Sequence, residues 1–311
     1  GEIMLVIKNL EKSYGSFKAV NGLNLEIKKG EIFGFIGPNG AGKSTTMKII
    51  SGLLSPDSGE VYVDGIDAIK NNKALKDKIG YMPDFFGVYD NLKAIEYLEF
   101  YASIYGIVGK EARELSMDLL RLVNLEDKYD AYVDGLSRGM KQRLCLARCL
   151  VHNPDLLILD EPASGMDPRA RYEMKGILRN LKEMGKTIIV SSHILPELGE
   201  VCTNIGIVKN GVVVCQGTVD EIMTRAAGAS PIVFTVLDKE EDAVKALKEL
   251  PYVDSIKVDD KKITANIKGD DICNLLKCLV VKDIPIINYS RAVGNLEDVF
   301  IQITADSDEE V

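Results

Sequence analysis

Three glycines, a lysine and two hydroxyl residues stand close together near the start of the chain, in a spacing that suits phosphate binding. The stretch consists of Gly37, Pro38, Asn39, Gly40, Ala41, Gly42, Lys43, Ser44 and Thr45. It lies between an apolar run, 32–36, and a segment of helical character, 46–50, which is the strand, loop and helix order of a phosphate cradle. Glycines let backbone N–H groups surround an anion, Lys43 offers a positive charge to the outer phosphates, and Ser44 offers a hydroxyl to Mg²⁺. With both flanking elements present, nucleotide binding is favoured over a chance match in a flexible loop.

Two carboxylates follow a second apolar run. Asp160 and Glu161 come directly after Leu156-Leu157-Ile158-Leu159, and the carboxyl end of a buried strand is the usual place for ligand chemistry in an open α/β sheet. Phosphoryl transfer to water needs a ligand for Mg²⁺ and a group that orients the attacking water. We assign the first task to Asp160 and the second to Glu161. Considered alone, the two carboxylates could equally form an acidic turn at the end of a strand. In a chain that also has the phosphate cradle, a catalytic role is favoured.

Two further features could contact an anion, and each also has a purely structural explanation. His193 follows the apolar run 187–190 through two serines, so its imidazole is placed to contact a γ-phosphate, although a structural histidine fits the spacing equally well. The segment 136–143 opens a helix that runs to about Val151, with Ser137 as N-cap and Gly139 allowing a close backbone approach. This helix start is either an anion site or simply a capped helix.

Short apolar runs and helical patterns position these residues. Runs at 4–7, 19–20, 23–27 and 60–64 predict an antiparallel sheet. Runs at 32–36, 156–159, 187–190 and 205–208 lack polar alternation and are separated by helices, which predicts parallel strands buried on both faces. Apolar residues at helical spacing in 92–105 and 111–123 predict an inserted helical region. The fold class is therefore α/β, with an antiparallel β subdomain and a helical subdomain at about 86–150.

A composition change near 224–231 to small and turn-forming residues predicts a domain boundary. Beyond it the pattern indicates strand 232–237, helix 240–250, strand 253–258, strand 262–268, helix 271–280 and strand 284–290. This β-α-β-β-α-β order is that of a ferredoxin-like α+β domain. We therefore expect domains at 1–225 and 226–311, the second ending in an acidic tail.

Composition limits the classes of partner. The chain has 311 residues, a formal net charge of -9 and a pI near 5.0, which argues against sequence-independent binding of nucleic acid because that binding depends on Lys and Arg. It contains no apolar stretch of 18 residues, so no membrane span is expected. Its six cysteines show no C-x-x-C pair, and with only two histidines a zinc site is not expected. Together with the lack of a signal peptide, this predicts a reducing cytoplasm.

The order of these motifs resembles that of the nucleotide-binding subunits of ABC transporters over about residues 3–220. The stretch 37–45 resembles their Walker A, 159–161 the end of Walker B with its catalytic glutamate, and 164–167 their D-loop. The segment 136–140, Leu-Ser-Arg-Gly-Met, resembles the signature Leu-Ser-Gly-Gly-Gln, and His193 falls at the switch histidine. Tyr14 resembles the aromatic residue that stacks on adenine, and Val20 the apolar residue beside the base.

The chain departs from the family pattern at two places. Arg138 and Met140 replace the usual glycine and glutamine of the signature, whereas Ser137 and Gly139 are retained. Asp84 stands where the family has the glutamine of its Q-loop; an aspartate still offers an oxygen to Mg²⁺ or water, but it is shorter and charged. Such departures are similar to those of exporter subfamilies whose ATPase is a separate polypeptide, including drug, antibiotic and sodium exporters. The segment 295–300 also resembles the closing segment of that subfamily.

The resemblance implies an ATPase with a P-loop NTPase core that binds ATP and Mg²⁺ and powers an exporter. Two such domains pack head to tail in the family, so Ser137, Gly139 and Asp167 are expected to act in trans on nucleotide held by Lys43 and Ser44 of the other copy. The second copy is the same chain or a paired subunit. A separate membrane permease is expected to dock near Asp84 and 92–123, which places the chain on the inner face of the cell membrane.

Three alternatives stay open. A soluble ABC-type ATPase of translation or DNA repair usually carries two cassettes or a long coiled coil, and the chain has neither. A non-hydrolysing regulatory module would fit Asp84 and the altered signature, but Lys43, Asp160 and Glu161 are retained. A P-loop kinase would leave the signature helix and His193 unexplained.

Overall fold

The chain divides into two compact units, Gly1–Thr218 and Val219–Val311. The computed structural model describes residues 1–84, 87, 91–192, 198–222, 231–259, 261–267 and 272–291. The division by contacts falls at Thr218, a few residues before the boundary expected after residue 225. Each unit has its own hydrophobic core, so the two are described separately.

A six-stranded sheet forms the centre of the first unit. Its strands are β3 (Ile32–Ile36), β6 (Ile79–Met82), β7 (Leu156–Leu159), β8 (Thr187–Ser192), β9 (Asn204–Lys209) and β10 (Val212–Thr218). They lie in the order β10-β9-β3-β8-β7-β6, and all neighbours are parallel except the antiparallel pair β10 and β9. Every residue of β3, β7 and β8 is buried, as expected for parallel strands covered on both faces. The parallel core predicted from the apolar runs is thus confirmed.

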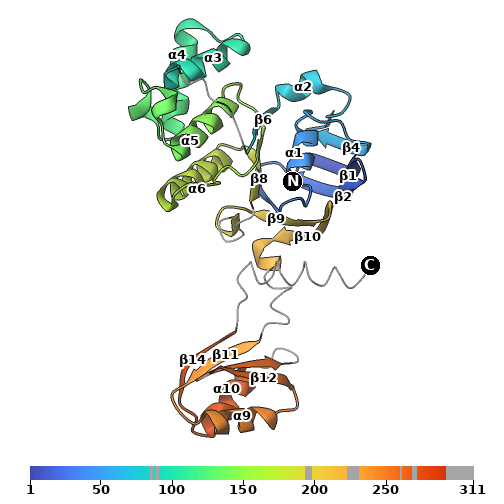
Figure 1. Cartoon of the computed structure of the whole chain (residues 1–311), viewed down its shortest axis with the longest axis vertical. Helices are drawn as coiled ribbons and strands as arrows, with labels where there is room; N and C mark the ends of the chain where they lie inside the picture. Colours follow the sequence, from blue (N-terminus) through green and yellow to red (C-terminus); the bar gives the residue numbers. More distant parts are fainter. Residues whose placement is uncertain are drawn as a thin grey trace. The chain divides into compact units, whose positions relative to one another are not determined.

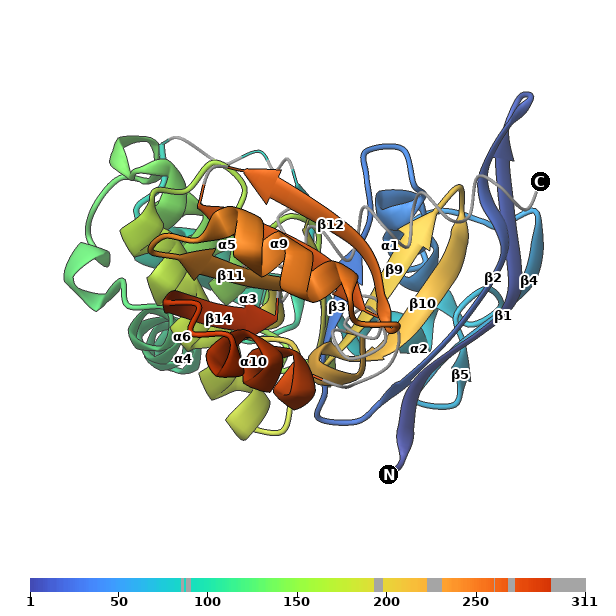
Figure 2. The same cartoon turned by 90° about the horizontal axis from the view of Figure 1, so that it is seen from below.

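An antiparallel sheet lies beside this core. It consists of β1 (Ile3–Tyr14), β2 (Phe17–Lys28), β4 (Ser58–Val63) and β5 (Ile66–Asp67), in the order β2-β1-β4-β5. Helix α1 (Lys43–Ile50) contributes Met47, Ile49 and Ile50 to one cluster with apolar side chains of both sheets. The strands of this sheet and the helical region lie on opposite sides of the central sheet (Figures 1 and 2).

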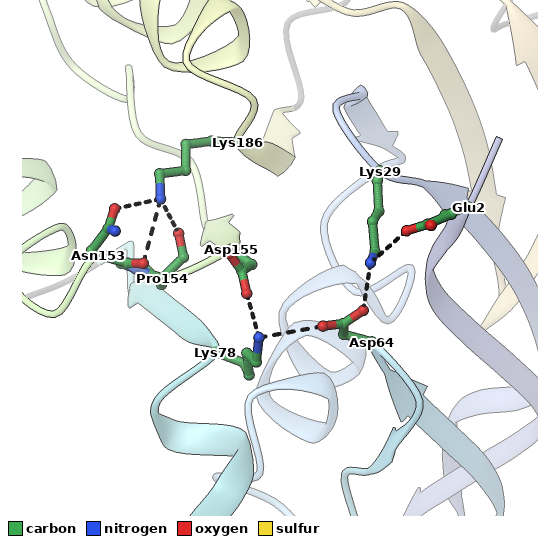
Figure 3. Close-up of polar contacts among 8 residues, drawn as sticks. All are labelled: Glu2, Lys29, Asp64, Lys78, Asn153, Pro154, Asp155 and Lys186. Atoms are coloured by element: carbon green, nitrogen blue, oxygen red, sulfur yellow. Dashed lines mark hydrogen bonds and ion pairs between the residues drawn. The ribbon is translucent and has the colours of Figure 1, made fainter.

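Ion pairs link the antiparallel sheet to the edge of the central sheet (Figure 3). Lys29 Nζ lies 2.9 Å from Glu2 Oε2 and 2.8 Å from Asp64 Oδ1, and Lys78 Nζ lies 3.4 Å from Asp64 Oδ2 and 2.6 Å from Asp155 Oδ2. Asp64 is therefore shared by two lysines, Lys29 in the turn after β2 and Lys78 directly before β6. The hydrogen bond from Lys29, followed by that from Lys78, lowers the pKa of Asp64, against a desolvation effect that raises it.

Replacing Asp64 with asparagine is expected to lower the free energy of unfolding by about 1 kcal/mol at pH 7, because two partly exposed ion pairs are lost. Since the folded-state pKa is lowered, the stabilisation is present above the ordinary aspartate pKa and is lost as pH falls toward the folded value. Urea unfolding at pH 7 and pH 3 measures both effects. Asp127→Asn, which removes a carboxylate that is 70% exposed, is the matched control. An equal loss of stability at both pH values would contradict a role for the charge of Asp64.

Helices on the other side of the central sheet carry the predicted signature. α3 (Ala94–Ile104), α4 (Gly109–Leu122) and α5 (Arg138–Cys149) form the inserted region, and α6 (Pro168–Glu183) follows β7. A short helix, α2 (Asn72–Lys76), precedes β6, and single turns η1 (Glu126–Lys128) and η2 (Val133–Gly135) join α4 to α5. In the part of the chain that the structure describes, no helix combines the length and apolarity needed to cross a bilayer.

The second unit is a four-stranded antiparallel sheet covered by two helices. β11 (Ile232–Val236), α9 (Glu240–Lys248), β12 (Val253–Asp259), β13 (Lys262–Ile267), α10 (Ile272–Val281) and β14 (Ile286–Arg291) follow one another along the chain. The sheet order is β12-β13-β11-β14. Both helices place apolar side chains in one cluster with the sheet, and both lie on the same face (Figure 1). Each element begins and ends within two residues of the range expected from the sequence. The expected acidic tail lies outside the described residues.

Candidate nucleotide site

The loop between β3 and α1 contains three glycines, of which two leave no space for a Cβ and two have a positive φ. A Cβ on Gly37 would lie 2.4 Å from the carbonyl oxygen of Val208, and one on Gly42 would lie 2.3 Å from that of Ala19. Gly40 and Gly42 have φ values of +83° and +101°, in the left-handed region that favours glycine. The loop therefore lies against two neighbouring strands while its backbone turns toward the start of α1.

Lys43 is held inside this loop. Its Nζ lies 2.6 Å from the carbonyl oxygen of Gly37 and 3.2 Å from that of Pro38, and the residue is 7% exposed. Desolvation lowers the pKa of Lys43, while the charges of Glu161 and Asp160 act in the opposite direction. The ammonium group thus lies near both carboxylates, at the carboxyl ends of the parallel strands.

The two carboxylate residues after β7 are tied to the end of β8. Ser191 Oγ donates to Asp160 Oδ1 at 2.7 Å and accepts from the backbone N–H of Glu161 at 2.9 Å. Asp160 is 3% exposed, and the backbone of Glu161 has a φ of +50°. A non-glycine residue in this conformation costs free energy and persists where surrounding contacts enforce it, often at functional sites. A role for Ser191 was not predicted from the sequence. Its position at the end of a buried strand, two residues before His193, is the feature that could have suggested one.

A pocket of about 200 Å³ joins these elements. It is lined by P-loop residues 39–45, together with Phe17, Ala19, Asp84 and Glu161. Asp84 is thus on the same pocket as Lys43 and Ser44. Hydroxyl and carboxylate oxygens are ligands that suit Mg²⁺. Ser44 and Asp84 supply such oxygens on the pocket, and Asp160 does not line it but is close enough for its charge to act on Lys43. The donor set therefore fits the ion.

The aromatic edge of the pocket differs from the expectation. Phe17 lines the pocket and is 56% exposed, whereas Tyr14, its partner across the β1–β2 hairpin, is 50% exposed and does not line it. Val20 is fully buried in the core shared by both sheets, so its side chain packs there and not on the pocket. Phe17 was missed because its orientation depends on the pairing at the end of the hairpin.

The predicted trans residues lie apart from this pocket. Ser137 is the N-cap of α5 and accepts from the backbone N–H of Met140 at 3.3 Å, as its position in the sequence predicted. Asp167 is the N-cap of α6 and accepts from the backbone N–H of Ala170 at 2.9 Å; this bond, first among several, lowers the pKa of Asp167. Gly139 is buried against Ala170. None of the three lines the pocket. His193 lies outside the described residues.

An open groove of about 610 Å³ lies where the inserted helices meet the edge of the central sheet. Its carboxylates are Asp77, Glu111, Glu114 and Asp118. The ring of Tyr105 stacks on His152 with centroids 4.4 Å apart. His152 Nε2 lies 2.9 Å from the carbonyl oxygen of Ile79, and burial lowers the pKa of the imidazole. The groove therefore combines an aromatic wall with an acidic rim.

A parallel sheet with a glycine-rich phosphate loop after one strand and a buried aspartate after another defines the class of P-loop nucleoside triphosphatases. The ABC transporter family profile matches residues 20–164. The linearmycin resistance ATP-binding protein LnrL of Bacillus subtilis (strain 168) is 34% identical over 97% of this chain and 98% of its own length. The Nod factor export ATP-binding protein I of Burkholderia orbicola (strain AU 1054) is 34% identical over 96% of this chain and 95% of its own. The chain belongs to the family of ABC transporter ATP-binding proteins.

Solved structures agree with this assignment. The dimeric post-hydrolysis structure of the ATP-binding cassette MJ0796 bound to ADP and Pi is 31% identical, with a TM-score of 0.64, and covers 69% of this chain and 98% of that chain. A nucleotide-free ATP-binding cassette from an ABC transporter is 25% identical, with a TM-score of 0.63, over 70% of this chain and 91% of that chain. The resemblance seen in the order of motifs is confirmed.

Proposed function

We propose that the chain hydrolyses ATP to power an exporter, with two nucleotide-binding domains closing on ATP and a separate permease carrying the substrate. The observation that supports this most directly is the pocket in which the P-loop, Asp84 and Glu161 meet. Relatives named for linearmycin resistance and Nod factor export support the exporter assignment.

Residues on the pocket and next to it divide the chemical tasks in this proposal. The P-loop N–H groups and Lys43 bind the phosphates, and Glu161 orients the attacking water and accepts its proton. Ser191 holds Asp160 and the backbone of Glu161 in fixed relation. Ser44 and Asp160 would hold Mg²⁺, with Asp84 as a further oxygen donor, and the ion when bound neutralises charge on the phosphates. His193 is proposed to contact the γ-phosphate.

Ser137, Gly139 and Asp167 complete the site from the second copy in this proposal. The N-terminus of α5 carries free N–H groups and the positive end of the helix dipole, which suit the γ-phosphate of the facing molecule. Loss of that phosphate after hydrolysis removes the charge that joins the two copies, so the dimer opens. Binding by one copy therefore needs only Lys43 and its neighbours, whereas turnover needs the dimer.

Tyr14 and Phe17 form the aromatic end of the β1–β2 hairpin, where we place the adenine. Tyr14→Ala and Phe17→Ala are each expected to weaken ATP affinity about three- to tenfold, because stacking area is lost. Fluorescent-nucleotide titration of each variant measures the effect, and Tyr129→Ala, which removes an exposed tyrosine remote in sequence, is the control. If ATP affinity falls in Phe17→Ala alone, the adenine stacks on Phe17 and not on Tyr14. Unchanged affinity in both variants would contradict this placement.

The acidic groove is the proposed docking surface for the permease at the inner face of the membrane. An aromatic wall and an acidic rim suit an amphipathic helix with basic residues.

The second unit, for which the composition change predicted the range 226–311, is proposed to be a ferredoxin-like domain with an accessory role. The β-α-β-β-α-β order of its elements supports this proposal.

Recovery of the tagged full chain from detergent-solubilised membranes tests the proposed function. We expect a multi-span membrane protein to co-purify with it, and the complex in liposomes to release phosphate from ATP. The charge reversal Glu111→Lys should reduce this recovery, while Glu183→Lys on the end of α6 should not. A chain that hydrolyses ATP but is recovered only with ribosomes or DNA would contradict the transport role.

A further inference from the structure

The arginine that departs from the usual signature lies on a glycine of another segment. Arg138 is the first residue of α5, and Gly165 lies in the turn 161–167 between β7 and α6. A Cβ built on Gly165 would lie 2.6 Å from Arg138 Cζ, 2.7 Å from Nη1 and 2.9 Å from Nε. Arg138 is exposed, and its planar guanidinium lies against the α carbon of Gly165, in a place from which a side chain at position 165 would displace it.

Helix α5 holds the same turn at a second point, one helical turn further on. Gln142 is 2% exposed, and its Nε2 donates to the carbonyl oxygen of Ser164 at 3.0 Å. The backbone N–H of Ser164 in turn donates to the carbonyl oxygen of Glu161 at 3.0 Å. The turn that carries Glu161 at its start and Asp167 at its end is therefore fastened to the helix that Ser137 caps.

We propose that Arg138 is a positioning residue that locks the start of α5 to the turn 161–167, so that Ser137, Gly139 and Asp167 meet the second copy as one rigid unit. This inference rests on the proposed function. Groups from two separate segments would otherwise have to be ordered at the moment of dimerisation, and that ordering weakens association. The lock removes part of this cost in advance, while nucleotide binding to the chain's own P-loop does not depend on it.

A double-mutant cycle tests the lock in a full-length Glu161→Gln background, which we expect to hydrolyse ATP too slowly to reopen the dimer. Sedimentation in saturating MgATP gives the dimer dissociation constant for Arg138→Ala, Gly165→Ala and the pair, and nucleotide titration gives the ATP affinity of each monomer. We expect either single change to raise the dimer dissociation constant about tenfold, because a Cβ at position 165 displaces the guanidinium that the other change removes. The dimer dissociation constant of the double variant should be no higher than that of the single variant that dimerises more weakly. Monomer ATP affinity should be unchanged throughout.

Two controls separate the lock from backbone strain at Gly165 and from the charge of Arg138. Alanine in the left-handed conformation of Gly165 carries the same backbone cost with or without Arg138, so this cost cancels in the cycle. Arg138→Lys keeps the charge but loses the planar group, and should dimerise as weakly as Arg138→Ala. Additive effects in the cycle, or wild-type dimerisation of Arg138→Lys, would overturn the lock while leaving the proposed function intact. Failure of the Glu161→Gln parent to dimerise with ATP would overturn both.

Discussion

The Glu161→Gln variant should bind ATP as tightly as the unaltered chain and hydrolyse it at least about a hundred times more slowly. Glutamine keeps the size of the side chain but cannot accept a proton, and loss of a positioned general base typically costs 10²–10⁴-fold in rate. Binding is retained because the P-loop and Lys43 are untouched. Phosphate release and nucleotide titration on the same preparation measure the two quantities.

Trapping of a dimer is the second expected property of Glu161→Gln. When hydrolysis is blocked, the γ-phosphate stays in place and the charge that joins the two copies is not lost. Sedimentation should therefore show a stable dimer in MgATP and a monomer in MgADP. Glu183→Gln, which changes an exposed glutamate at the end of α6, controls for the substitution and should keep normal turnover. Normal turnover of Glu161→Gln would remove this residue from the role of general base.

The central sheet was predictable because its strands are short apolar runs bounded by helices. β7 and β8 were identified in this way, and their parallel pairing follows from the helix between them. β6 and β10 were missed, and in β6 Gly80 interrupts the short apolar run. The structure explains that glycine: a Cβ there would lie 2.5 Å from the carbonyl oxygen of Cys149 at the end of α5. Close packing against a helix far along the chain leaves no local signal in the sequence.

The length of strand β2 could not be predicted from the sequence either. The sequence pattern indicated separate segments at 19–20 and 23–27, because Gly22 interrupts the alternation, whereas the structure has one strand from Phe17 to Lys28. Gly22 has a φ of +69°, and the pairing of β2 with β1 shifts register at this glycine, between the pairs Leu10–Leu23 and Glu11–Asn21. The glycine therefore allows an irregularity within a continuous strand. Distinguishing this from a break requires knowledge of the partner strand.

The residues of the candidate site also fall into those that local sequence predicts and those that only the fold reveals. Lys43, Ser44, Asp160 and Glu161 lie in motifs whose chemistry is local, and their order along the chain was enough to select them. Ser191, Phe17 and the contact of Arg138 with Gly165 depend on how distant segments meet. Ser191 joins the ends of β7 and β8, and Arg138 crosses from α5 to the turn 161–167. Such residues have ordinary types and spacing, so only the fold reveals what they contact.

Removal of the Lys43 charge should weaken nucleotide binding more than loss of either aromatic side chain of the β1–β2 hairpin. In Lys43→Met the length of the side chain is kept, but the phosphates lose their buried cation. Hydrogen bonds that involve a charged group contribute about 1.5–3 kcal/mol each, so ATP affinity should fall at least about a hundredfold. Lys48→Met, which changes an exposed lysine in the last turn of the same helix, is the matched control and should bind normally.

The pH dependence of ATP binding gives an independent test of the same residue. Because burial lowers the pKa of Lys43, its positive charge in the free chain is lost at a lower pH than that of an ordinary lysine as the solution becomes alkaline. ATP affinity should therefore decline as pH rises, starting below the ordinary lysine pKa, and this decline should be absent from Lys43→Met. Unfolding measured over the same pH range shows whether the fold stays intact. Affinity that is equal in Lys43→Met and the unaltered chain would show that the phosphates bind elsewhere.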